Sequence, residues 1–310
     1  MKVMFMGTPD YAAAALKALI DSRHEVVLVV TNPDKPAGRG GKLTLSPVKE
    51  LALAGKLEVF QPERIRNAEA QARLEAAHAD IGVVAAFGQI LSAENLRTPR
   101  HGCINIHASL LPAYRGSSPI QQAILDGAEE TGVTIMQMDE GVDTGDILMQ
   151  EKCTIDDLDT AGTLFDKLSA IGASLLIRAL DAIEEQRVVP VKQEEALATR
   201  TGKISKDRGM IRWQHEASYI ARHIRAMSPW PSAYTRLPDG RILKIWRALP
   251  VPDTSPKEAG IVTGVTEDFF LIRCGSDALK VTEIQLEGKK RMSVHDFLLG
   301  YDLEEGICLR

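Results

Sequence analysis

Residues 2–20 read KVMFMGTPDYAAAALKALI, and the order of apolar run, turn and helix-forming segment within them indicates the class of fold. The apolar run at 3–6 ends at the turn Gly7-Thr8-Pro9-Asp10, and an alanine-rich segment at 11–20 follows. A short apolar run, a turn signal and a helix-forming segment predict a buried strand, a tight turn and a helix. The chain is therefore expected to begin with a strand–helix unit.

The same alternation continues along the chain. Helix-like segments at 67–78 and 118–125 are interspersed with further apolar runs, which lie at 26–30, 59–60, 81–87 and 103–107. Strands that alternate with helices form βαβ units, and the strands of such units lie parallel. The sequence therefore predicts an α/β fold, with a Rossmann-like, mostly parallel sheet and helices on both faces.

Two more expected strands, at 134–138 and 147–153, enclose the loop 139–145. Thr160 then caps a long predicted helix that ends near residue 186. We expect this first domain to comprise residues 1–188.

Residues 189–206 have no apolar period and contain proline, glycine and many charges, which is typical of a linker. From residue 207 the pattern changes, because one predicted helix at 216–227 precedes short strands at 242–248, 260–265, 269–274 and 279–286. Short strands separated by turns predict a small antiparallel β-barrel of the OB-like type. We assign it to residues 207–310.

Composition limits the function classes. The 310 residues carry a net charge of −5, so nucleic-acid binding would require a local basic patch. The four cysteines lack metal-ligand spacing, which predicts reduced thiols and no metal site. No apolar stretch approaches the roughly 20 residues that cross a bilayer, and the N-terminal run is too short for a signal peptide. We expect a cytoplasmic monomer with no membrane partner.

Two glycine-containing segments bear on nucleotide binding. The turn at 7–10 lies where a Rossmann phosphate loop would, but it is not GxGxxG, and Pro9 removes an amide donor. The segment 34–45 fails the pattern GxxxxGK[ST], because Pro36 replaces the first glycine and Leu43 follows the lysine. A nucleotide-binding oxidoreductase is therefore disfavoured. We expect 34–45 to lack regular structure, with its three cations either solvated or bound to phosphates: Lys35, Arg39 and Lys42.

Candidate catalytic residues lie near the end of the predicted strand 103–107. Asn105 and His107 alternate with isoleucines, so the two polar side chains project from one face of the sheet. Open α/β sheets bind ligands at the carboxyl ends of their strands. A catalytic histidine needs a carboxylate that orients it and favours its charged form, and Asp143 is the natural candidate. Chain spacing alone leaves open whether Asp143 reaches His107 and whether His107 is structural.

The segment 105–116, NIHASLLPAYRG, resembles the signature of the folate-dependent formyltransferases, as do Pro119, Ile120 and Gln121 after it. The loop that ends in Asp143-Thr144-Gly145 resembles the second signature of this family. The resemblance implies catalysis by Asn105, His107 and Asp143, with 10-formyltetrahydrofolate as formyl donor and without a metal. It also implies a folate site at Phe87, Gly88, Gln89, Ile90, Leu91, Ser109, Leu110, Leu111, Pro112 and Asp139.

Other segments resemble the branch of this family that formylates the methionine carried by initiator tRNA for translation initiation. They are the Gly7-Thr8-Pro9 turn and the segments 33–40, 202–206 and 228–233, so the resemblance covers essentially the whole chain. It implies that the C-terminal domain binds tRNA and that the loop with Lys35, Arg39 and Lys42 contacts the acceptor end.

Two alternatives stay open at this point. The acceptor could be a small amine such as an amino sugar or glycinamide ribonucleotide, although an enzyme for the latter would lack the C-terminal domain. The chain could also be a folate-binding module without catalysis. The presence of Asn105, His107 and Asp143 argues against the second alternative.

Overall fold

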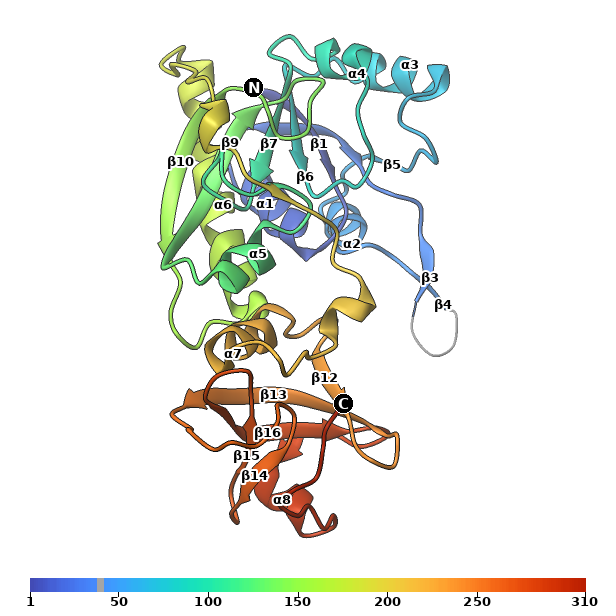
Figure 1. The fold of residues 1–310 in the computed structure, drawn as a ribbon. Helices are drawn as coiled ribbons and strands as arrows, with labels where there is room; N and C mark the ends of the chain where they lie inside the picture. The colour runs from blue at the N-terminus through green and yellow to red at the C-terminus, as the bar shows by residue number, and fades with distance from the viewer. Residues whose placement is uncertain (38–41) are drawn as a thin grey trace. The chain divides into compact units, whose positions relative to one another are not determined.

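The computed structural model describes residues 1–37 and 42–310, except for the side chains of Pro36, Ala37 and Lys42. The chain forms two compact units (Figure 1). Unit 1 comprises residues 1–119, 130–154 and 165–201, and unit 2 comprises 120–129, 155–164 and 202–310. The predicted domains, 1–188 and 207–310, differ from these units because unit 2 also contains residues 120–129 and 155–164. The predicted domain boundaries stay a prediction.

Unit 1 is built on a seven-stranded sheet in the order β10-β9-β7-β6-β1-β2-β5. Its strands are β1 (Lys2–Gly7), β2 (Glu25–Val30), β5 (Val59–Phe60), β6 (Ile81–Ala85), β7 (Cys103–His107), β9 (Glu130–Gln137) and β10 (Ile147–Thr154). All neighbours from β5 to β7 pair in parallel, whereas β9 is antiparallel to both β7 and β10. The chain runs from β1 toward β5 on one side and from β6 toward β10 on the other. This reversal creates a switch point between β1 and β6, where open sheets bind ligands.

Helices pack on both faces of this sheet. On one face, α3 (Ala68–Ala76) and α4 (Ala93–Arg97) join a buried cluster that includes Met4, Met6 and Cys103. On the other face lie α1 (Asp10–Ile20) and α6 (Ala161–Glu184), whose rings Tyr11 and Phe165 meet edge to face at 5.6 Å. The remaining helices of the first 130 residues are α2 (Pro47–Ala54) and α5 (Pro119–Asp126). The prediction of a mostly parallel α/β sheet is confirmed.

The expectation that residues 34–45 lack regular structure is wrong. Strands β3 (Lys35–Ala37) and β4 (Lys42–Thr44) pair antiparallel, with Lys35 opposite Thr44. Strands of three residues are too short to show alternation, and a proline in an isolated two-stranded ribbon removes only one donor. Arg39 lies outside the described residues.

A second two-stranded sheet involves the segment expected to be a linker. Strand β8 (Arg115–Gly116) follows the Leu-Leu-Pro turn and pairs in parallel with β11 (Arg200–Thr201). The short 3-10 helix η1 (Glu195–Leu197) precedes β11. Residues 189–201 therefore belong to unit 1, although they carry no apolar period.

Unit 2 is built on a six-stranded antiparallel sheet in the order β12-β13-β16-β15-β14, with β17 paired to β16. Phe270, Leu279 and Val281 are among its fully buried residues. This sheet confirms the predicted change from a parallel to an antiparallel architecture. Between residues 202 and 310, the elements of unit 2 are η2 (Lys206–Gly209), α7 (Ala217–Ala226), β12 (Ala233–Arg236), β13 (Ile242–Val251), β14 (Val262–Val265), β15 (Phe270–Arg273), β16 (Ala278–Leu286), β17 (Met292–Ser293) and α8 (Val294–Leu298).

Across the described residues, none of the helices combines the length and apolar character that crossing a membrane requires.

Candidate active site

Loops from three neighbouring strands meet at the switch point of the sheet in unit 1. Asn32, just after β2, donates from Nδ2 to Thr8 Oγ1 at 3.0 Å and to the carbonyl oxygen of Phe87 at 2.5 Å. Gln89 donates from Nε2 to Asn32 Oδ1 at 2.9 Å, and its Oε1 accepts from the amide of Ile65. The loops after β1, β2 and β6 are therefore held together by buried and half-buried side chains. Thr8 and Asn32 were not among the residues predicted from the sequence.

Asn105 and His107 lie on β7, and the pleat places them on the same face as Cys103. His107 is 6% exposed, and its Nε2 lies 3.0 Å from the carbonyl oxygen of Tyr114. A carbonyl oxygen only accepts hydrogen bonds, so Nε2 carries a proton and Nδ1 is the ring nitrogen left for other partners. Asn105 is half-buried, and its side-chain amide has no hydrogen-bond partner within the part of the chain that the structure describes.

Asp143 reaches His107, a proximity that chain spacing left open. Its Oδ2 lies 3.7 Å from Nδ1 of His107 and accepts a hydrogen bond from the amide of Gly116 at 2.7 Å. The distance to Nδ1 exceeds hydrogen-bond length, as is common for catalytic pairs without substrate. Asp143 has a φ of 55°, a left-handed conformation that few residues other than glycine adopt. Hydrogen bonds to Asp139 brace the loop 139–145 internally, and the Gly116 amide contacts it from outside.

The Leu110-Leu111-Pro112 turn is anchored from β9. Buried Thr134 donates from Oγ1 to the carbonyl oxygen of Ser109 at 2.6 Å and accepts from the amide of Leu111 at 3.0 Å. Ser109 Oγ in turn donates to the carbonyl oxygen of Ala113, and the peptide bond before Pro112 is cis. These contacts fix the loop that connects His107 to Gly116.

The residues expected to bind folate differ in exposure. Phe87 and Leu91 are 2% and 7% exposed and belong to the core cluster on the α3 side of the sheet, so a ligand can meet mainly their backbone. Ile90 is 71% exposed on the same loop, and Gly88 has a φ of 82°. Asp139, at the start of the 139–145 loop, accepts hydrogen bonds from Thr144 and from the amide of Gly141. The expected folate residues thus lie on three loops, which follow β6, β7 and β9.

The expected tRNA-contacting cations are described only in part. Lys35 is exposed on β3, and Lys42 begins β4. Asp34, beside them, forms an ion pair with Lys49 at 2.5 Å and accepts from Gln61. These two hydrogen bonds, with Lys49 first, lower the pKa of Asp34.

A polar cluster that the sequence did not predict lies against the 139–145 loop. Arg115 is 2% exposed and donates to Gln193 and Glu195. Gln193 donates to the carbonyl oxygens of Asp143 and Gly145. The sequence signal for this cluster was Arg115, a charged residue that follows the Leu110-Leu111-Pro112 turn.

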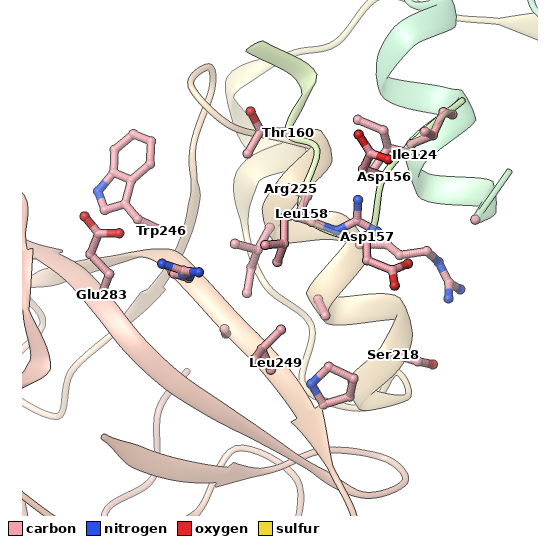
Figure 2. Close-up of a pocket in the computed structure, with 18 of the residues that line it drawn as sticks. Ile124, Asp156, Asp157, Leu158, Thr160, Ser218, Arg225, Trp246, Leu249 and Glu283 are labelled. Carbon is pink, nitrogen blue, oxygen red and sulfur yellow. The ribbon is translucent and has the colours of Figure 1, made fainter. Parts of the chain in front are cut away.

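Unit 2 contains a cavity of about 690 Å³, separate from the residues described above. Figure 2 shows it between α7, which contributes Ser218 and Arg225, and β13, which contributes Trp246 and Leu249. Asn105, His107 and Asp143 lie in unit 1. The chemically equipped site is therefore the edge of the parallel sheet.

A mostly parallel sheet that brings an amide and an imidazole together on β7, with a carboxylate beside them, is equipped for acyl or formyl transfer. The family model described as formyl transferase matches residues 1–180, and the model of the formyl transferase C-terminal domain matches residues 203–302. The chain belongs to the formyl transferase family. Among its relatives is the methionyl-tRNA formyltransferase of Lachnospira eligens, 48% identical over 314 residues, which cover 100% of this chain and 99% of the relative.

Two solved structures share the fold. The sugar 3N-formyl transferase WlaRD, described in the presence of dTDP and 5-N-formyl-THF, has a TM-score of 0.67 at 21% identity. The match covers 94% of this chain and 99% of that one. Glycinamide ribonucleotide transformylase 1 from Symbiobacterium toebii matches with a TM-score of 0.53 at 20% identity, over 63% of this chain and 94% of its own. At these identities the likeness concerns the fold alone.

Proposed function

We propose that the protein transfers the formyl group of 10-formyltetrahydrofolate to the amino group of methionyl initiator tRNA and so produces N-formylmethionyl-tRNA for translation initiation. The observation that carries this proposal is the 48% identity, over essentially both full lengths, to a methionyl-tRNA formyltransferase. The two family matches support it, because the chain contains both the formyl transferase domain and the formyl transferase C-terminal domain.

The reaction is an acyl transfer between two nitrogens. The deprotonated methionyl amine attacks the formyl carbon, and the carbonyl π electrons move to oxygen to give a tetrahedral oxyanion. The intermediate collapses, the bond from carbon to folate N10 breaks, and N10 takes up the proton lost by the amine. Hydrogen-bond donors aimed at the oxyanion supply the largest stabilisation in such a reaction.

Asn105 and His107 are the proposed oxyanion donors. Both lie on one face of β7, and the Asn105 amide is uncommitted among the described residues. Because Nε2 of His107 already contacts the carbonyl of Tyr114, the protonated Nδ1 is the proposed donor to the substrate. Asp143, 3.7 Å from Nδ1, orients the ring and balances its charge. It can also order a water that carries the proton from amine to N10.

The folate donor is proposed to bind between the 87–91 and 109–112 loops and Asp139. The exposed Ile90 offers an apolar surface to a pteridine or benzoyl ring, and the backbone of Gly88, Gln89 and Leu110 offers polar groups. The 5-N-formyl-THF described with WlaRD, a protein of the same fold, supports a folate as the donor but gives no location for it.

The tRNA is proposed to contact the β3–β4 hairpin, through Lys35, Arg39 and Lys42, and also the C-terminal domain. The hairpin follows β2 and so begins at the edge of the sheet that carries the catalytic residues. We further propose that the enzyme acts as a monomer in the cytoplasm, where initiator tRNA is charged. Its four cysteines are free thiols, which suits a reducing compartment.

Formyl transfer to competing acceptors tests the proposal. Purified protein, 10-formyltetrahydrofolate and one acceptor are mixed, and formylated product is counted. We expect transfer to methionyl initiator tRNA and negligible transfer to glycinamide ribonucleotide or to a nucleotide-linked amino sugar. Transfer to a small amine alone would replace the proposed acceptor, and transfer to none of them would overturn the proposed function.

A further inference from the structure

Gln193 connects the catalytic carboxylate loop to a segment some 50 residues further along the chain. Its Nε2 donates to the carbonyl oxygen of Asp143 at 2.8 Å and to that of Gly145 at 2.7 Å. Its Oε1 accepts from Nε of Arg115 at 3.0 Å. A carbonyl only accepts and a guanidinium only donates, so one orientation of the amide satisfies all three contacts.

Arg115 fixes Gln193 in turn. Its guanidinium is 2% exposed and binds both carboxylate oxygens of Glu195 through Nη1, at 2.8 and 3.0 Å. Its backbone amide donates to the carbonyl oxygen of Thr199, and Thr199 Oγ1 accepts from the amide of Tyr114. The segment 193–201 therefore contacts the end of the loop between His107 and Gly116, and Arg115 anchors the side chain of Gln193.

The loop that Gln193 contacts carries the catalytic carboxylate and has a left-handed backbone at Asp143. Asp143 has a φ of 55°, which costs free energy for a residue with a side chain. Its carboxylate has one backbone donor, the amide of Gly116, which lies at the end of the loop that segment 193–201 contacts. Hydrogen bonds from Gln193 to the carbonyls on either side of Thr144 therefore set where the carboxylate points.

We propose that Gln193 is a positioning residue of the formyl-transfer reaction, which holds Asp143 at the distance from His107 that catalysis requires. The inference rests on the proposed function. Gln193 does not touch the reacting atoms, and its effect on the rate passes through Asp143. Misplacement of a catalytic group by about 1 Å costs on the order of 10²-fold in rate.

Two substitutions distinguish the loss of the hydrogen-bond donors of Gln193 from the loss of its side-chain volume. Gln193→Glu keeps the shape and the contact to Arg115, but it turns a carboxylate oxygen toward two carbonyl oxygens. Gln193→Ala removes all three contacts. We expect kcat to fall about 10- to 100-fold in each variant, while KM for 10-formyltetrahydrofolate and for the charged tRNA changes less than about threefold. The exposed neighbour variant Lys192→Ala is the matched control and should keep wild-type kcat.

A double-mutant cycle with Asp143→Ala distinguishes positioning from a general loss of structure. If Gln193 acts through the Asp143 carboxylate, then Gln193→Ala lowers the single-turnover rate less than about twofold in the Asp143→Ala background. A purely structural role predicts the same fold-loss in both backgrounds, and that result would overturn the inference, as would wild-type kcat in Gln193→Glu.

The wild-type protein is assayed in the same series. If it transfers no formyl group to methionyl-tRNA, the proposed function has failed. If it does transfer and the Gln193 variants match it, only the role of Gln193 has failed.

Discussion

At the catalytic site, the sequence predicts which side chains share a face of β7, but it does not predict how close Asp143 comes to His107. The alternation of β7 places Asn105 and His107 together, and this follows from the pleat of any strand. The approach of Asp143 to 3.7 Å from His107 depends instead on its left-handed backbone and on Gln193. The first was therefore readable in the sequence, whereas the second was not.

Gly116 combines a positive φ with a close backbone contact. Its φ is 112°, and a Cβ there would lie 2.2 Å from the carbonyl oxygen of Thr201. We expect Gly116→Ala to cost about 2–4 kcal/mol of unfolding free energy and to lower kcat, because the Gly116 amide donates to Asp143. Denaturant unfolding and steady-state assay measure both.

The control for that substitution is Gly202→Ala. A Cβ on Gly202 would meet no described atom within 4 Å, and its φ is not in the left-handed region. It should change stability by less than about 0.5 kcal/mol. If Gly116→Ala were equally silent, the tight contact between β8 and β11 would not exist in solution.

Among the secondary-structure elements, strands and helices with apolar periods were predicted, and elements held by polar contacts were not. The strand at 103–107 and the helix near 118–125 agree with β7 and α5. The pairing of β8 with β11 was missed because Arg115, Gln193 and Thr199 take part in hydrogen bonds that span about 80 residues of chain. Such contacts leave no local pattern, so a polar, proline-containing segment was interpreted as a linker.

We expect the cations of the β3–β4 hairpin to contribute to tRNA binding and turnover but not to folate binding. Arg39→Ala together with Lys42→Ala should weaken kcat/KM for charged tRNA and leave KM for the folate donor unchanged. The salt dependence of tRNA binding should become shallower, by roughly one unit of log-log slope for each phosphate that the hairpin no longer binds. Binding measured over a salt series, with steady-state kinetics, checks both expectations.

The control is the double variant Lys17→Ala and Lys152→Ala, which removes the same amount of charge at two other sites. These lysines are 58% and 72% exposed. If both double variants showed the same salt slope, the hairpin cations would act only through net charge.

For the molecule as a whole, the change from a parallel to an antiparallel sheet was predictable, because the spacing of strands and turns changes near residue 207. The assignment of 120–129 and 155–164 to unit 2 was not. It rests on contacts such as Arg222 to the carbonyl of Leu125 and Arg225 to that of Asp159, which long-range packing creates.

Two buried histidines with lowered pKa values, His24 in unit 1 and His223 in unit 2, make the stability of the fold depend on pH. Burial lowers the pKa of His24, and the nearby N-terminal ammonium lowers it further, against the opposing effect of Asp181. Burial likewise lowers the pKa of His223, whose Nε2 donates to the carbonyl of Arg208. Both groups therefore take up a proton more readily in the unfolded chain.

Below the ordinary histidine pKa of 6.5, the unfolded state binds more protons than the folded state, so the free energy of unfolding falls as pH falls. Above that pH this contribution is complete and constant. We expect denaturant unfolding to show a decrease in stability between about pH 6.5 and about pH 5, and His223→Gln to reduce it. The exposed His78→Asn should leave the slope unchanged, and an equal slope in all three proteins would contradict this assignment.

A single-turnover experiment tests whether His107 and Asp143 catalyse formylation of methionyl initiator tRNA. In this experiment product release does not affect the measured rate. Enzyme in excess is mixed with 10-formyltetrahydrofolate and charged tRNA, and the rate of N-formylmethionyl-tRNA formation is measured for wild type, His107→Ala and Asp143→Asn. We predict complete transfer by wild type and a rate at least about 10²-fold lower in each folded variant, comparable to the loss of an oxyanion donor. Wild-type rates in either variant would contradict the assigned catalytic roles, and no product from wild type would contradict the proposed function.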